Sequence, residues 1–135
     1  MHVLTPNIYR TLSESLQTFD YITKTGNFGF WDRELARWSG VAIMYGLTHT
    51  RLKKRHGITD ERAALYEEVG KFTEALGARK FMGGETPNLA DLSLFGVLRA
   101  VKGFDTHADV MAHTALRPWY ERMEAEVGAS SRLPA

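Results

Sequence analysis

Apolar residues recur at steps of three and four along most of the chain, which is the spacing of one face of an α-helix. The first such stretch follows Thr11 and Glu14, which are spaced as a capping box and predict a helix start. This helix is expected to end near Gly26. The ten residues before it are predicted to be extended, because Pro6 disfavours helix at Thr5.

A second helical pattern runs from about Phe30 to Arg55. The pair Ser39-Gly40 is expected to kink this helix or to split it in two. A basic turn followed by Gly57 is expected to end it, since cations and glycine suit a helix C-terminus. The residues expected to face the core are Trp31, Leu35, Trp38, Ala42, Tyr45 and Leu52.

Three more helices are predicted in the second half of the chain, besides the one described next. One follows the N-cap residue Thr59 and ends at Gly77, a short one covers Thr106 to His113, and the last begins at Pro118. No segment alternates long enough to predict a strand. The fold class is therefore an all-α bundle of about six or seven helices with no sheet. The residues predicted to point inward are Leu65, Val69, Phe72, Leu76, Trp119, Met123 and Val127.

The clearest local signal is a Gly- and Pro-rich loop that leads into a helix. Asn88 is a strong N-cap residue, and Asp91 three positions later can accept from the N–H of the cap. Pro87 and Leu92 are spaced for a hydrophobic staple across the helix start. Because this helix is apolar nearly all round, it is predicted to be buried, with a neighbouring helix crossing closely at Gly96.

Composition then narrows the classes of function. The chain has 135 residues, which is one domain by size, with a helical domain expected over 11–128, a linker at 1–10 and a flexible tail at 129–135. The net charge of +1 gives no reason to expect a nucleic acid or an anionic membrane as partner. The absence of cysteine excludes disulfides, thiolate nucleophiles and Cys-ligated metals in this chain. No apolar run approaches about 18 residues, so no transmembrane segment is predicted.

The residues offer one candidate binding pair and no complete catalytic set. Arg51 and Arg55 stand four positions apart on one predicted helix, so both guanidinium groups can converge on a carboxylate or a phosphate. A solvated basic helix end explains the same spacing, and the residues alone leave both interpretations open. The five histidines lack the spacing of a metal site, and no serine, histidine and aspartate arrangement indicates a nucleophile. No catalytic or metal-ligating residue is therefore assigned.

Beside these patterns, several stretches carry a more specific resemblance: Pro6-Asn7, Phe19-Asp20-Tyr21-Ile22, Arg51-Leu52-Lys53, Phe81-Met82-Gly83-Gly84, Pro87-Asn88-Leu89-Ala90-Asp91-Leu92 and Pro118-Trp119-Tyr120. The capping box and staple resemble those of glutathione S-transferase C-terminal domains. Taken together, the stretches are similar to the C-terminal helical domain of the membrane-associated prostaglandin E synthase 2 family, within the glutathione S-transferase superfamily. The resemblance covers the chain from about His2 to Val127.

The resemblance implies a function that needs a second domain. Members of the family carry an N-terminal glutaredoxin/thioredoxin-like domain with a Cys-x-x-Cys motif, and they isomerise prostaglandin H2 to prostaglandin E2. They bind glutathione and haem in the cleft between the two domains, and they form homodimers. It also implies a chain that is soluble, and cytoplasmic or associated with a membrane through an N-terminal region. No nucleic-acid partner is implied.

Four residues of this chain match positions near the cofactor cleft of the family. His2 and Thr5 match the connector that borders the cleft, and Arg51 and Arg55 match an arginine pair that faces it. A lipid-derived carboxylate, a haem propionate or glutathione suits the arginine pair. Because the chain has no cysteine, we expect it to be inactive as an isomerase by itself. The alternative is a non-catalytic interaction or assembly module of the same fold.

Overall fold

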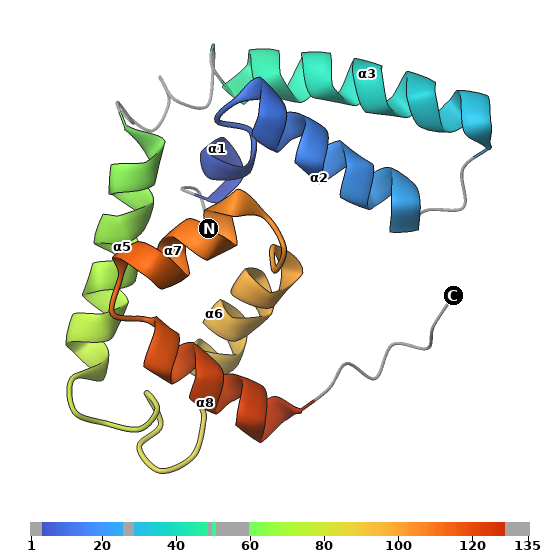
Figure 1. Ribbon diagram of the computed structural model, residues 1–135. Coiled ribbons are helices and arrows are strands. Elements are labelled where there is room, and N and C mark those ends of the chain that lie inside the picture. Colours follow the sequence, from blue (N-terminus) through green and yellow to red (C-terminus); the bar gives the residue numbers. More distant parts are fainter. Residues whose placement is uncertain (1–3, 26–28, 49, 51–59, 129–135) are drawn as a thin grey trace.

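The computed structural model describes residues 4–25, 29–48, 50 and 60–128. Those residues form seven α-helices and no strand beyond one isolated bridge between Phe81 and Gly84, which confirms the all-α prediction. Figure 1 shows α2 and α3 side by side along one edge, and α5 to α8 gathered beside them. The helices are α1 (Leu4–Ile8), α2 (Leu12–Thr25), α3 (Phe30–Leu47), α5 (Glu61–Leu76), α6 (Leu89–Ala100), α7 (Asp105–His113) and α8 (Arg117–Val127).

The start of the chain differs from the sequence prediction, because residues 4–8 are helical rather than extended. Pro6 is tolerated there, since the N–H groups of a first helical turn have no partner within the helix. Tertiary contacts hold the segment: the fully buried Asn7 donates from Nδ2 to the carbonyl of Glu61 at 2.6 Å. The carbonyl of Asn7 accepts from Thr106 Oγ1 at 3.3 Å. A five-residue helix thereby joins α5 to α7, although the role of residues 1–10 as a linker stays a prediction.

Helix α2 begins as predicted. The backbone N–H of Thr11 donates to Glu14 Oε2 at 3.1 Å, and the N–H of Glu14 donates to Thr11 Oγ1 at 3.1 Å. Both halves of the capping box are therefore present.

Helix α3 runs without a break from Phe30 to Leu47, so the kink or split expected at Ser39-Gly40 is wrong. Gly40 serves a different purpose. A Cβ atom at this position would lie 2.5 Å from Cζ and 2.8 Å from Cδ1 of Phe19 in α2. The missing side chain lets the Phe19 ring approach the backbone of α3, and the two helices pack closely.

The predicted core face of α3 is also wrong, because most of it is exposed. Trp31, Leu35 and Trp38 are 81%, 71% and 57% exposed, and the buried positions are instead Val41 and Thr48. The physical reason is that α3 lies at an edge and packs mainly on α2, so the described helices cover it mainly on the side toward α2. Leu52 and the rest of the predicted helix up to Arg55 lie outside the described residues.

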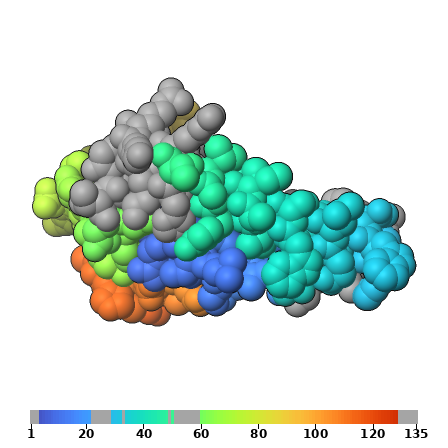
Figure 2. All heavy atoms as spheres, turned by 90° about the horizontal axis from the view of Figure 1, so that it is seen from above, coloured from blue at the N-terminus to red at the C-terminus, as the bar shows by residue number. Residues whose placement is uncertain are grey.

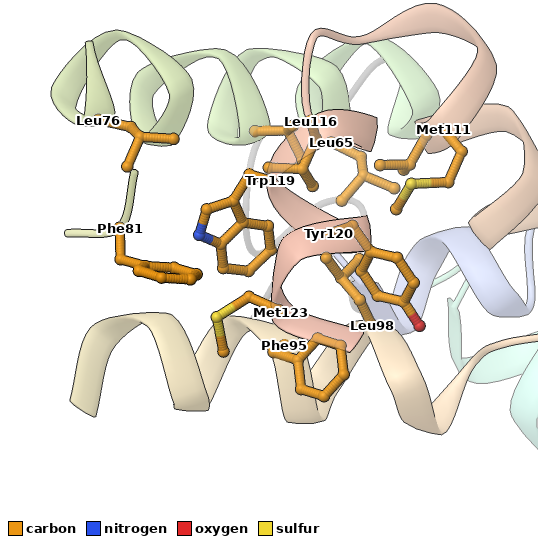
Figure 3. Close-up of a cluster of buried hydrophobic side chains, with 12 residues drawn as sticks. Leu65, Leu76, Phe81, Phe95, Leu98, Met111, Leu116, Trp119, Tyr120 and Met123 are labelled. Atoms are coloured by element: carbon orange, nitrogen blue, oxygen red, sulfur yellow. The ribbon is translucent and has the colours of Figure 1, made fainter. Parts of the chain in front are cut away.

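The hydrophobic core lies between α5, α6, α7 and α8 and includes the loop residue Phe81 (Figure 3). The ring of Trp119 is the centre of this cluster, 4.9 Å from the ring of Phe72 in an edge-to-face arrangement. Prediction and structure disagree at Val127, which is 42% exposed at the end of α8. The predicted inward residues that are buried are Leu65, Val69, Leu76, Trp119 and Met123.

Helix α6 starts as predicted but is not buried on all sides. The side-chain oxygen of Asn88 accepts from the N–H groups of Ala90 and Asp91, and the carboxylate of Asp91 accepts from the N–H of Asn88. Leu89 is nevertheless 79% exposed and Leu92 is 48% exposed. Within the described chain nothing lies within 4 Å of a Cβ built at Gly96, so the predicted close crossing there is wrong. The other helices cover one side of α6 only.

Candidate functional site

A hollow of about 640 Å³ lies between α5 and α6, beside the first residue of α1. Its volume falls in the range of ordinary small-molecule sites, about 300–1,000 Å³. Ten residues line it: Leu4 from α1, Leu65, Glu68, Val69 and Phe72 from α5, and Ala90, Ser93, Leu94, Val97 and Leu98 from α6.

The two helices face each other across the hollow through residues at steps of three and four. On α5 these positions include the predicted inward residues Leu65, Val69 and Phe72, so the sequence pattern identified this face. Leu65, Val69 and Leu98 are at most 5% exposed and form the floor. The hollow is therefore an extension of the hydrophobic core that opens to solvent.

Only two of the lining side chains are polar, and both are exposed. Ser93 carries a hydroxyl, and Glu68 accepts a hydrogen bond from Lys71 Nζ at 2.7 Å. Hydrogen bonds that Lys71 donates to Glu68 and Glu67 raise the pKa of Lys71, so this ammonium stays charged at neutral pH. The hollow can accept an apolar group, and the carboxylate of Glu68 at its mouth is paired with the ammonium of Lys71.

Asp91 is the most highly connected polar side chain near this site, and it is fully buried. Its carboxylate accepts from the N–H groups of Met82, Gly83 and Asn88 at 3.0, 3.3 and 3.0 Å. It also accepts from the indole Nε1 of Trp119 at 2.9 Å. Burial alone would raise the pKa of Asp91, but these hydrogen bonds together hold the pKa below its ordinary value. Because protein donors occupy both oxygens, Asp91 has a structural role.

The structure describes some of the predicted site residues and not others. Thr5 lies in α1, half-buried, next to Leu4, which lines the hollow. His2, Arg51 and Arg55 lie outside the described residues, so their assignment to a cleft stays a prediction. Pro87 is half-buried beside the helix start, whereas Leu92 of the predicted staple is largely exposed.

A buried ion cluster joins three helices and was not identified from the sequence. Arg62 of α5 donates from Nη2 to Glu14 of α2 at 2.5 Å and lies 3.0 Å from the carboxylate of Asp109 in α7. Arg10 contacts the same Glu14 at 3.2 Å. Glu14 and Arg62 are 48 positions apart, and no local pattern signals a pair at that separation. The capping-box role of Glu14 was the only available signal.

The described part of the chain lacks both the side-chain cluster of a metal site and the long apolar helix of a membrane span. Within it, no three His, Asp or Glu side chains gather as a metal site would require. Nor does any helix there combine the length and the apolarity needed to cross a bilayer.

Comparisons with known proteins found a matching family model and similar relatives. The family model described as "Glutathione S-transferase, C-terminal domain" matches residues 41–126. Prostaglandin E synthase 2 of Mus musculus is 46% identical over 129 residues, which are 94% of this chain and 33% of the mouse protein. Prostaglandin E synthase 2 of Danio rerio is 44% identical over 126 residues, which are 92% of this chain and 33% of that protein. The chain thus spans about a third of the length of these relatives.

Proposed function

Because the chain belongs to the glutathione S-transferase C-terminal domain family, we propose that it forms the helical half of a prostaglandin E synthase 2-like enzyme. The observation that carries this proposal is the identity of 44–46% to two such synthases over more than nine-tenths of the chain. The complete protein would isomerise prostaglandin H2 to prostaglandin E2. The other half would be the glutaredoxin/thioredoxin-like domain that the resemblance predicts.

The hollow between α5 and α6 would form an apolar wall of the cleft shared with that domain. Leu4 lines the hollow only a few residues after the matched connector residue His2, which supports a place beside the domain boundary. The lining suits the hydrocarbon chain of a lipid-derived substrate. The substrate carboxylate would be bound by Arg51 and Arg55, which match the arginine pair of the family.

The hollow itself does not fit either cofactor that the resemblance predicts. None of its ten lining residues is a His, Cys, Met or Tyr, which are the side chains that ligate haem iron. None is a cation that could pair with a carboxylate of glutathione or a propionate of haem. Binding of glutathione or haem would therefore depend on Arg51, Arg55, His2 and Thr5 together with the second domain.

The chemical step would also depend on the second domain. The family uses a positioned thiol, and this chain has no cysteine. The part played by this chain would be to bind and orient the substrate and to exclude water from one side of the cleft.

The proposal is tested by comparing the chain alone with the chain fused behind the glutaredoxin-like domain of the mouse relative. With glutathione present, the fusion should convert prostaglandin H2 to prostaglandin E2, whereas the chain alone should not. A fusion that folds but remains inactive would contradict the enzyme proposal. Isomerase activity in the isolated chain would contradict the assigned division of roles.

Substrate placement is tested in the fusion with variants of the arginine pair. Arg51→Ala and Arg55→Ala should each weaken fatty-carboxylate binding by about 1.5–3 kcal/mol, or roughly ten- to a hundredfold. Lys53→Ala, in the same basic stretch, is the control and should leave the affinity unchanged. Equal losses in all three variants would indicate a general charge effect rather than a specific pair.

The hollow is tested with a matched pair of substitutions on α6. Val97→Trp would fill the hollow, because Val97 lines it, and should weaken fatty-carboxylate binding. Ala100 is exposed on the same helix, so Ala100→Trp should leave fatty-carboxylate binding unchanged. Similar affinities for the two variants would place the hydrocarbon chain elsewhere.

A second candidate function is a non-catalytic interaction module, possible for a cysteine-free helical domain. The exposed apolar face of α3 favours it, since such a face marks an interaction site. The reading frame upstream of this chain distinguishes the two candidates. A Cys-x-x-Cys domain encoded there supports the enzyme, and its absence supports the module. The homodimer that the resemblance predicts is compatible with both.

A further inference from the structure

Helix α1 is too short to hold itself in place, yet two residues of the candidate site belong to it. An isolated helix needs about 12–15 residues to be stable in water, and α1 has five. Leu4 lines the hollow, and the half-buried Thr5 matches the connector beside the cleft of the family. The position of both residues must therefore come from contacts that α1 makes with other helices.

Hydrogen bonds to three different helices hold α1. Asn7 donates from Nδ2 to the carbonyl of Glu61, the first residue of α5, at 2.6 Å, and its own carbonyl accepts from Thr106 Oγ1 of α7 at 3.3 Å. The carbonyl of Ile8 accepts from Thr18 Oγ1 of α2 at 3.1 Å. Figure 1 shows α1 between α5 and α2, and Figure 2 shows blue α2 adjoining green α5 and orange α7.

The side chains that make these bonds are buried, with Asn7 at 0%, Thr106 at 1% and Thr18 at 4% exposure. A hydrogen bond needs a particular distance and angle, whereas an apolar contact has no preferred direction. Because a buried amide is costly to leave without a partner, the bond from Asn7 to Glu61 favours one position of α1 over neighbouring ones. The bond therefore selects a geometry, besides adding to stability.

This geometry reaches the hollow on both sides. Leu4, Thr5 and Asn7 lie within a single helical turn, so the position of Asn7 fixes the other two. On the opposite side, Leu65 follows Glu61 by about one turn of α5 and lines the hollow. The bond between Asn7 and Glu61 thus sets how Leu4 lies relative to the α5 wall.

We propose that Asn7 is a positioning residue of the candidate site: by fixing α1 to the first residue of α5, it holds Leu4 at the hollow and Thr5 at the connector. This rests on the proposed function and deepens it, because it assigns the shape of the site to a side chain that does not line the hollow. A residue that served only global stability would affect the site no more than any other buried residue does. The experiments below separate these two roles.

Binding of cis-parinaric acid, a fluorescent fatty carboxylate, to the full chain tests whether Asn7 acts through Leu4. Asn7→Ala and Leu4→Ala should each weaken binding by about three- to tenfold. The double variant should bind no more weakly than the single variants, because both changes remove the same contact with the probe. Additive losses in the double variant would overturn the proposal, and so would a parent chain that does not bind the probe.

Met123→Ala is the matched control for a loss of stability. Met123 is 0% exposed in the core but is not among the residues that line the hollow. This variant should lower the urea midpoint and leave the affinity for cis-parinaric acid unchanged. An equal loss of affinity in Met123→Ala and Asn7→Ala would reduce Asn7 to a general structural role and overturn the proposal. If Asn7→Ala fails to fold, Thr106→Val takes its place, since it removes the bond to the carbonyl of Asn7 and keeps the amide.

The absence of native cysteine allows a test of α1 without any ligand. The thiol of a Leu4→Cys protein should react with iodoacetamide about three- to tenfold faster when Asn7→Ala is added, because α1 then leaves its position more often. Adding Met123→Ala instead should leave the rate unchanged. Equal rates with and without Asn7→Ala would show that Asn7 does not fix α1 and would overturn the proposal.

In the fusion protein, Asn7→Ala should raise the KM for prostaglandin H2 several-fold and change kcat little, because Asn7 shapes a binding wall and not the reacting centre. A loss of kcat with an unchanged KM would overturn the positioning role. Because the probe and thiol experiments need no turnover, they decide the role of Asn7 even if the fusion is inactive. Failure of this proposal and failure of the enzyme proposal are therefore distinguishable.

Discussion

The indole Nε1 of Trp119 donates a hydrogen bond of 2.9 Å to Oδ1 of Asp91, across 28 positions of sequence. This bond attaches α8 to the first turn of α6. The same carboxylate accepts from the backbone of Met82 and Gly83, so it also holds the loop before α6. Figure 3 shows Trp119 within the core cluster that this loop closes through Phe81. The capping pattern in the sequence predicts only the start of α6. It does not predict the contacts of Asp91 with the loop and with Trp119.

Asp91→Ala should destabilise the fold by about 3–5 kcal/mol, because each buried donor left without an acceptor costs about 1–3 kcal/mol. The loss exceeds the roughly 1 kcal/mol of a simple helix cap, because the substitution leaves the Trp119 indole and two loop N–H groups without an acceptor. Urea unfolding measures the difference. Glu85→Ala, an exposed carboxylate in the neighbouring loop, is the control and should change stability little. A loss near 1 kcal/mol would show that only the cap matters.

The pH dependence of stability should identify the same carboxylate. The folded-state pKa of Asp91 lies below its ordinary value. A carboxyl group of this kind contributes stability above its unfolded pKa of about 3.9, and the contribution is lost as the pH falls through the folded value. The difference in unfolding free energy between the parent chain and Asp91→Asn should therefore be constant from about pH 7 to 5 and narrow below about pH 4. If the difference in unfolding free energy stays constant in acid, the folded state does not favour the ionised form of Asp91.

Two glycines in helix interiors should respond in opposite directions to alanine. Gly40→Ala would place a Cβ atom in steric overlap with the edge of the Phe19 ring and should cost about 1–3 kcal/mol. Gly96→Ala meets no atom within 4 Å in the described chain and should stabilise α6 by up to about 1 kcal/mol. Thermal unfolding measures both. Adding Phe19→Leu should recover part of the Gly40→Ala loss, and no recovery would exclude the ring as the cause.

The buried ion cluster should be sensitive to its central cation. Arg62→Ala leaves Glu14 without its buried partner and should cost about 3–5 kcal/mol. Arg62→Met keeps most of the side-chain volume and should cost nearly as much if charge is the cause. Denaturant unfolding of both variants decides between charge and packing. Recovery of stability in Arg62→Met would contradict an electrostatic role.

Local features of this fold could be predicted because their partners are near in sequence. The capping boxes at Thr11 and Asn88 each join residues three positions apart, and both are present. The inward face of α5 follows from its own helical period. Helix α1 could not be predicted, because Asn7 is held by Glu61, which is 54 positions away.

The sequence by itself determined the helical class, the capping boxes at Thr11 and Asn88, the lack of a thiol and the resemblance to one family. An apolar stripe, however, indicates only that a helix face is suited to burial. It does not indicate which element covers that face. Val69 and Trp31 belong to equally clear stripes, yet one is 4% exposed and the other 81%. Only the tertiary structure decided this, because burial depends on which helices meet. Among the described residues, neighbouring helices cover the Val69 face of α5, whereas α3 packs mainly on α2 and leaves Trp31 exposed.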